Sequence, residues 1–121
     1  MKNCPFCQEQ RVLLENDLAY AIFDKYPVST GHILVIPRRH HETIFESKED
    51  EITAIFSLLR RVRDYLASKY DPDGYNIGIN IGRAAGQSIK HLHMHVIPRY
   101  RGDRRIAKGG VRGVIPDKQS Y

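Results

Sequence analysis

Three histidines alternate with apolar residues towards the end of the chain, at His91, His93 and His95. Successive side chains of a β-strand point to opposite faces, so the three imidazoles would share one face while Leu92 and Met94 enter the core. An imidazole titrates near neutral pH and can serve as a nucleophile, an acid or base, or a metal ligand. The spacing therefore predicts either a catalytic zinc held by three histidines or metal-free imidazole chemistry.

The loop before the histidines favours the metal-free alternative. Gly86, Gln87 and Ser88 offer backbone N–H groups, an amide and a hydroxyl, all of which suit phosphate oxygens. Hydrolytic zinc sites usually bring a carboxylate near the metal, and the histidine segment contains none. We therefore expect imidazole chemistry on a phosphate group.

The two cysteines, Cys4 and Cys7, are separated by two residues. They could be a redox dithiol, although the βαβ setting of that motif is absent, or two idle thiols, or half of a tetrahedral metal site. His40, His41 and His91 offer further imidazoles for such a site. Two cysteines are too few for a disulfide framework.

Strands and one long helix must position these side chains. Four segments have the apolar, β-branched character of strands, namely residues 18–23, 32–36, 75–81 and 91–97. Apolar residues at spacings of three and four predict a helix over residues 47–70, with its buried face at Ile52, Ile55, Phe56, Leu59, Val62 and Leu66. Ser47 and Asp50 resemble a helix cap. Together these elements predict an α+β domain built on an antiparallel meander.

The composition indicates one small globular domain. The chain has 121 residues, of which 41% are hydrophobic, and a core of that size favours pairing as a homodimer. No apolar run approaches the ~20 residues of a membrane span. The N-terminus has no apolar signal region, so we expect a cytoplasmic protein without a membrane partner.

Basic residues gather between Arg99 and Lys118, and the formal net charge is +5. This segment is either a solvated tail or an attractor for phosphates of a small ligand. It has little aromatic interleaving, so we expect no nucleic-acid partner.

The histidine run continues into Val96 and resembles the signature of the histidine triad (HIT) family. The similarity extends upstream through residues 31–40, Asp24 and Asn80, and it covers about residues 4–100. It implies a HIT-like fold, an antiparallel sheet meander with one long helix, as a single domain over residues 1–121 with a basic tail from about residue 101. It also implies a homodimer that acts on purine nucleotides and needs no organic cofactor.

The resemblance further implies a role for each matching residue. His93 would attack the α-phosphate and form a nucleotidyl-histidine intermediate that water hydrolyses. His95 would bind the phosphate and help to protonate the leaving group, while His32 and His91 would orient the nucleophile. The nucleotide would be held by Ile22 at the base, Asp24 at the ribose, and Asn80, Gly86, Gln87 and Ser88 at the phosphates.

Bacterial members of the family that begin with CxxC are similar to this chain. That similarity implies a closed structural zinc site of Cys4, Cys7, His40 and His91, with His41 as the alternative to His40. The expected activity is hydrolysis of a dinucleoside polyphosphate such as diadenosine tetraphosphate. The alternatives are a nucleoside phosphoramidase and a catalytically weak purine nucleotide-binding regulatory protein. Arginines of the tail, Arg104, Arg105 and Arg112, would then meet the distal phosphates.

Overall fold

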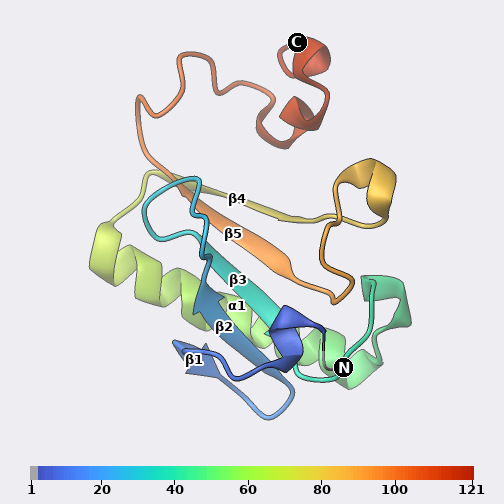
Figure 1. Ribbon diagram of the computed structural model, residues 1–121. Coiled ribbons are helices and arrows are strands. Elements are labelled where there is room, and N and C mark those ends of the chain that lie inside the picture. The colour runs from blue at the N-terminus through green and yellow to red at the C-terminus, as the bar shows by residue number, and fades with distance from the viewer. Residues whose placement is uncertain (1–2) are drawn as a thin grey trace.

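In the computed structural model, which describes residues 3–121, one long helix packs against one face of a five-stranded antiparallel sheet (Figure 1). The helix is α1 (Glu49–Tyr70), and the strands are β1 (Leu14–Glu15), β2 (Ala19–Phe23), β3 (Ile33–Pro37), β4 (Gly74–Ile79) and β5 (Met94–Arg99). Their order in the sheet is β1-β2-β3-β5-β4, so β5 lies between β3 and the edge strand β4. The predicted α+β fold with an antiparallel sheet and one long helix is confirmed.

Apolar side chains form a buried layer on each of the two faces of the sheet. The layer under α1 holds Ala19, Ala21, Ile33, Val35, Leu92, Met94 and Val96, packed against Ile55, Leu58, Val62 and Leu66 of the helix. The opposite layer holds Phe6, Tyr20, Ile22, Leu34 and Ile36. Leu92 and Met94 therefore enter the core as predicted, which leaves the alternate histidines for the side of the sheet away from α1.

The strand predicted from His91 begins later, at Met94. Residue 92 would continue the ladder opposite Pro37, because Val35 pairs with Met94. Proline has no N–H to donate, so the ladder ends there. The Leu92 N–H instead donates to the His41 carbonyl oxygen over 2.8 Å.

Two details of the predicted helix were wrong. The N-cap is Lys48, and the Ser47 hydroxyl instead pairs with His41 Nε2 at 2.7 Å. Phe56, which was predicted to be buried, is 49% exposed, and Leu58 lies in the core instead. The buried stripe runs at spacings of three, four and four residues from Ile55, and Phe56 points about 100° away from it.

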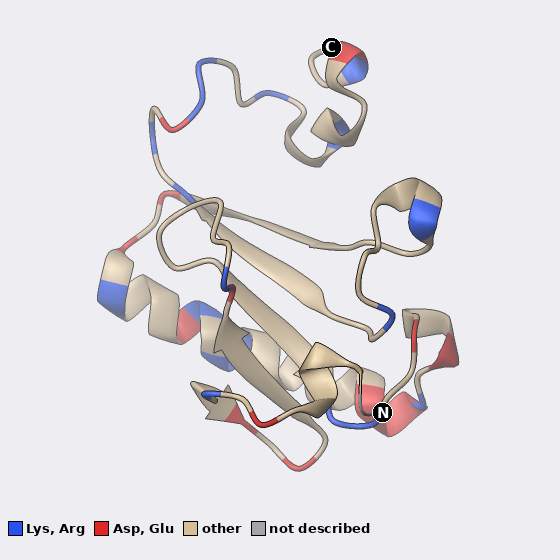
Figure 2. Cartoon of the chain, in the orientation of Figure 1, with Lys and Arg blue, Asp and Glu red and all other residues tan. Residues whose placement is uncertain are grey.

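The segment after β5 folds back towards the edge of the sheet as two short 3-10 turns, η4 (Gly110–Val114) and η5 (Pro116–Lys118). Figure 1 shows this tail beyond β4, and Figure 2 shows that basic residues recur along it. Its turn η4 contacts β4. Within residues 3–121, no helix is both long and apolar enough to cross a membrane.

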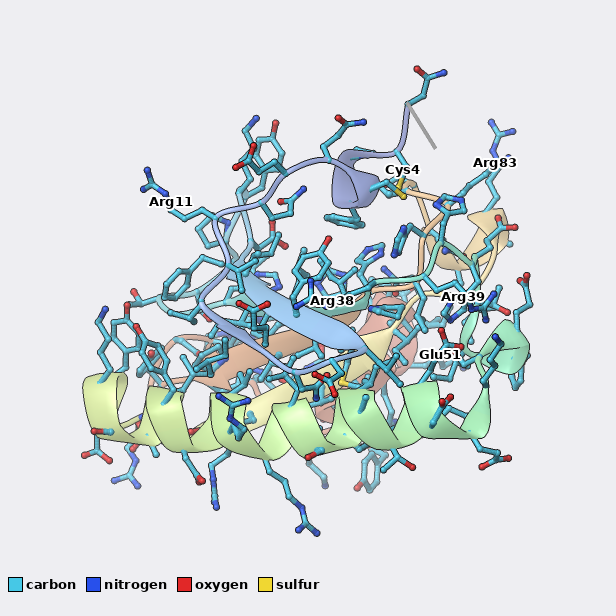
Figure 3. The ribbon with its side chains drawn as sticks, turned by 90° about the horizontal axis from the view of Figure 1, so that it is seen from below. Cys4, Arg11, Arg38, Arg39, Glu51 and Arg83 are labelled. Carbon is cyan, nitrogen blue, oxygen red and sulfur yellow. The ribbon has the colours of Figure 1, made fainter. Side chains whose placement is uncertain are left out.

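A buried carboxylate joins the start of α1 to the segment that follows β3. Glu51 is 3% exposed, and its two oxygens accept hydrogen bonds from Arg39 Nε and Nη2, each at 2.9 Å. One of these oxygens also accepts the Lys48 N–H at 2.8 Å, which satisfies an otherwise free donor of the first helical turn. Figure 3 shows Arg39 and Glu51 together at this end of α1. The Arg39 hydrogen bonds are the main cause that lowers the pKa of Glu51 to about 2.

We expect Glu51→Ala to lower the free energy of unfolding by about 2 kcal/mol, because three hydrogen bonds to a charged group are lost and Arg39 loses its partner. Urea unfolding at neutral pH measures the change. Glu49→Ala, an exposed acid of the same helical turn, is the control and should change the stability by less than about 0.5 kcal/mol. An equal loss of stability in Glu51→Ala and Glu49→Ala would contradict the stabilising role of the Glu51 hydrogen bonds.

Candidate active site and metal cluster

Most of the predicted catalytic and nucleotide-binding residues meet in one cleft of about 800 Å³ on the side of the sheet away from α1. Those that line it are Ile22, Asp24, His32, Asn80, Gly86, Ser88, His93 and His95. They come from β2, the turn into β3, the loop after β4 and the histidine run, so the cleft depends on the pairing of β3 with β5. A volume of this size accommodates a nucleotide.

His93 has a fixed tautomer. Its Nδ1 lies 2.8 Å from the backbone carbonyl oxygen of His91. A carbonyl can only accept, so Nδ1 carries the proton and Nε2 keeps its lone pair. The ring of Phe6 packs 5.1 Å from that of His93, which restricts rotation of the imidazole. The arrangement gives His93 one nucleophilic nitrogen.

A second chain of hydrogen bonds fixes His95. The Val28 N–H donates to His32 Nδ1 over 3.1 Å, so the proton of His32 is on Nε2. That Nε2 is 3.0 Å from His95 Nδ1 and 3.4 Å from Asp24 Oδ2. His95 Nδ1 therefore accepts a hydrogen bond, and its Nε2–H remains as a donor.

This geometry refines the roles expected of two histidines. His32 was predicted to orient the nucleophile, but it contacts His95 instead of His93. His91 does contact His93, yet through its backbone carbonyl and not its imidazole. The imidazole of His91 points to the two cysteines.

Burial favours the neutral form of the two histidines in this hydrogen-bonded chain. Loss of solvent is the largest cause that lowers the pKa of His32 and of His95 below 6.5, and the negative charge of Asp24 opposes it only in part. Protonation of His32 Nδ1 would break its bond with the Val28 N–H. The neutral state is thus the one that the surroundings select.

Gln87 is an exception among the predicted nucleotide-binding residues. Its carbonyl oxygen accepts the Gly82 N–H at 2.9 Å, and its amide nitrogen donates to the backbone of Glu42 and Ile89 at 2.8 and 3.2 Å. The side chain is buried and is not part of the cleft lining. The expectation that its amide contacts phosphate is not supported, because the amide holds the loop that presents Ser88.

Phe6 was not predicted as a site residue, although it lines the cleft. It stands between the two cysteines and packs against both His91 and His93. The sequence feature that could have identified Phe6 is the presence of a bulky aromatic residue between two potential metal ligands. Its position depends on the fold of the N-terminal segment over the sheet, which no local pattern reveals.

Beside the cleft, four side chains form a cluster with the composition of a metal site. The ligand atoms of Cys4, Cys7, His40 and His91 all lie within 4.8 Å of one another. His91 Nδ1 is 3.3 Å from Cys4 Sγ and 3.2 Å from His40 Nδ1, and Cys7 Sγ is 3.3 Å from His40 Nδ1. Bonds of about 2.0–2.3 Å from a tetrahedral metal to N and S ligands give edges of about 3.3–3.8 Å. The donor set therefore fits a closed tetrahedral site.

The structure distinguishes the two candidate ligands that follow β3. His41 Nδ1 is 3.0 Å from the Arg39 carbonyl oxygen and His41 Nε2 is 2.7 Å from the Ser47 hydroxyl, so both of its nitrogens are engaged. His40 faces the cysteines. His91 donates from Nε2 to the Pro37 carbonyl oxygen at 2.8 Å, which leaves its Nδ1 lone pair for a metal. Figure 3 shows Cys4 on the opposite side of the sheet from α1.

A catalytic zinc held by all three histidines of the run does not match this geometry. In the described part of the chain, the groups able to converge on one ion are the cysteine cluster and a set of Asp24, His32 and His95. His93 belongs to neither of them. It is positioned to act through its free nitrogen.

The family comparison agrees with these observations. The family model described as the HIT domain matches residues 7–102. The chain belongs to the HIT family. An uncharacterized HIT-like protein of Methanocaldococcus jannaschii is 37% identical over 95% of this chain and 94% of its own length.

Two further relatives in the HIT family carry names of enzymes. A protein of Arabidopsis thaliana named adenylylsulfatase is 35% identical over 91% of this chain and 59% of its own length. A protein of Mycobacterium tuberculosis named AP-4-A phosphorylase is 32% identical over 90% of this chain and 57% of its own length.

Solved structures of HIT proteins share the fold. The crystal structure of a HIT family protein from Bacillus anthracis has a TM-score of 0.79 and 30% identity, and the match covers 91% of this chain and 84% of that one. A Zn-bound HIT family protein from Mycobacterium smegmatis has a TM-score of 0.77 and 30% identity, and the match covers 85% and 79% of the two chains.

The lowered pKa values predict a pH dependence of stability. The unfolded chain takes up protons at His32 and His95 at a higher pH than the folded chain, so the free energy of unfolding should fall as the pH drops below 6.5. Urea unfolding at about pH 7.5 and about pH 5.5 measures the fall. The fall in the free energy of unfolding should be smaller in His32→Gln, because glutamine does not titrate. An unchanged fall in that variant would contradict a lowered pKa of His32 in the folded chain.

Proposed function

We propose that this HIT protein hydrolyses nucleotides at the α-phosphate through a covalent intermediate on His93 Nε2. The observation that carries the proposal is the tautomer of His93, whose Nδ1–H is bound to the His91 carbonyl while Nε2 is free in a nucleotide-sized cleft. Ser88 and Gly86 line the same cleft and can donate to phosphate oxygens. Asp24 and Ile22 also line this cleft, and they suit ribose hydroxyls and a base.

The reaction takes two displacements at phosphorus. In the first, the lone pair of His93 Nε2 forms a bond to the α-phosphorus, and the bond to the leaving oxygen breaks with its electron pair on that oxygen. The Nε2–H of His95 hydrogen-bonds the departing oxygen. In the second, water attacks the phosphorus and releases one proton to solvent, the P–N bond breaks with its electron pair on His93 Nε2, and a nucleoside monophosphate leaves with the water oxygen.

The neutral form of His95, with its hydrogen on Nε2, favours a polyphosphate as the leaving group. Neutral His95 can stabilise an oxyanion by donating a hydrogen bond, but full proton transfer from it would leave an unfavourable imidazolate. A polyphosphate departs as a stable anion, whereas an amine must be protonated. We therefore favour dinucleoside polyphosphates, and the relative named AP-4-A phosphorylase supports this class. A phosphoramidase remains the alternative, and a weak nucleotide-binding protein is the third candidate.

We expect the wild type to release AMP from diadenosine tetraphosphate faster than from adenosine phosphoramidate, and His93→Ala to lose at least about a thousandfold in kcat, because the nucleophile is gone. Chromatography of the products measures both rates. Lys90→Ala, an exposed residue of the same loop, is the control and should keep its activity. Turnover retained by His93→Ala would contradict the covalent mechanism, and AMP binding without turnover would favour the regulatory candidate.

We also propose that the cluster of Cys4, Cys7, His40 and His91 binds one structural zinc. Four protein ligands leave no position for water, so the metal would stabilise the fold and take no part in hydrolysis. The cluster ties the N-terminal segment to the histidine run. Two cysteines that form no disulfide suit a reducing compartment, which supports the expected cytoplasmic location.

Metal analysis should find about one zinc per chain in the wild type and almost none in His40→Ala. His41→Ala is the matched control and should keep its zinc, because its nitrogens bond to Arg39 and Ser47. Chelation should lower the melting temperature of the wild type and of His41→Ala, but not that of His40→Ala. Full zinc content in His40→Ala would overturn the ligand set.

The proposed assembly is a homodimer that forms at β4. This strand ends the sheet with unpaired backbone groups, and Ile77 on it is 46% exposed. A free edge of this kind is usually covered or paired. Light scattering should give twice the chain mass of 14.0 kDa, and Ile77→Lys should shift it to the monomer.

A further inference from the structure

A second cleft of about 410 Å³ adjoins the nucleotide cleft beside His95. The two share Val28, His32, Asn80 and His95, whereas His93 lines only the first. The second cleft lies between the exposed face of β4 and β5 and the tail. We call it the tail chamber, and its other walls are Asn76, Ile77, Gly78, Ile97, Arg99, Arg104, Gly110, Val111, Gly113, Val114 and Gln119.

Gly78 leaves the tail chamber open next to His95. The register pairs it directly with His95 across β4 and β5. Its backbone does not require glycine, and a Cβ built on it would meet no atom within 4 Å. A glycine inside a strand costs stability and often marks a close approach by a ligand. Neither packing nor a turn explains this glycine.

The lining of the chamber suits a phosphorylated group with an apolar end. Among the described residues that line it there is no carboxylate, and its cations are Arg99 and Arg104. Arg99 is held by Asp103 at 2.7 and 2.8 Å, whereas Arg104 forms no ion pair with any described residue. Val28, Ile97 and Val111 add apolar surface. A nucleoside carrying phosphates presents both kinds of group.

The tail arginines do not all reach this chamber. Arg104 lines it, but Arg105 does not. Arg112 donates to the backbone oxygens of Lys118 and Gln119 at 2.8 and 3.2 Å, so it braces the tail. Of the three arginines expected to meet distal phosphates, only Arg104 is placed to do so.

We infer that the tail chamber binds the leaving half of the substrate, a nucleoside polyphosphate. In an in-line displacement the leaving oxygen lies opposite the nucleophile. With His93 on one side of the α-phosphorus and His95 beside the departing oxygen, the leaving group extends past His95 into the chamber. This inference rests on the proposed function and narrows it, because a small amine would leave the chamber empty.

Binding to the inactive His93→Ala protein, measured by calorimetry, tests the inference without turnover. Diadenosine tetraphosphate should bind at least about tenfold more tightly than AMP, which occupies only the first cleft. Gly78→Leu, made in the same background, should remove this advantage and change the affinity for AMP less than about twofold. Gly74→Leu is the matched control, because Gly74 lies on the same face of β4 outside the chamber, and it should preserve the advantage.

Arg104→Glu supplies a second test on an exposed residue that does not affect the sheet. It should weaken the dinucleotide about tenfold and leave AMP unchanged, whereas Arg105→Glu, with the same charge change, should have little effect. Two results would overturn the assignment of the tail chamber: equal losses of dinucleotide affinity in Arg104→Glu and Arg105→Glu, or a tighter binding of the dinucleotide than of AMP that survives Gly78→Leu. In either case, retained binding of AMP would still support the nucleotide site. No binding of AMP would instead refute the proposed function, and the chamber with it.

Discussion

The hydrogen bond from His93 Nδ1 to the His91 carbonyl is the contact on which the rest of the site depends. His91 takes part in three interactions at once: its carbonyl accepts this bond, its Nε2–H donates to Pro37 at the end of β3, and its Nδ1 faces the cysteine cluster. Each contact restricts a different part of the residue. The proposed nucleophile, His93, is therefore held by a backbone group that the sheet and the N-terminal segment immobilise together.

His93 and His95, two of the three histidines that line the cleft, are fixed by opposite arrangements. A carbonyl acceptor places the proton of His93 on Nδ1, whereas a chain that begins at the Val28 N–H leaves His95 with its hydrogen on Nε2. One ring therefore offers a lone pair and the other a donor. Burial maintains this division by keeping His32 and His95 neutral. Backbone groups at two turns thus determine the chemical roles of side chains of the same type.

Sequence periodicity predicted the α+β architecture, the core-facing Leu92 and Met94, and the shared side of the sheet for the cleft-lining His93 and His95. These depend on local geometry, which repeats every two residues in extended chain and every 3.6 in a helix. The start of β5 could not be predicted this way, because it depends on which residue Pro37 opposes across the sheet. The helix cap likewise depends on Glu51, whose partner Arg39 lies outside the helix.

The same limit applies to the site. A motif indicated that Gln87 lies near phosphate, but only the folded loop shows that its amide is consumed by Gly82 and Glu42. His40 and His41 are neighbours with the same side chain, and their surroundings alone distinguish them. The tail chamber depends on how the tail returns to β4, a contact without a local signature.

The measurement that most directly tests the central claim is the stereochemical course at the α-phosphorus. A dinucleotide made chiral there with one sulfur atom can be hydrolysed in heavy-oxygen water and its monophosphate product analysed. Each in-line displacement inverts the phosphorus, so attack by His93 followed by attack by water predicts overall retention. Inversion would mean that water attacks directly, and it would contradict the covalent role of His93.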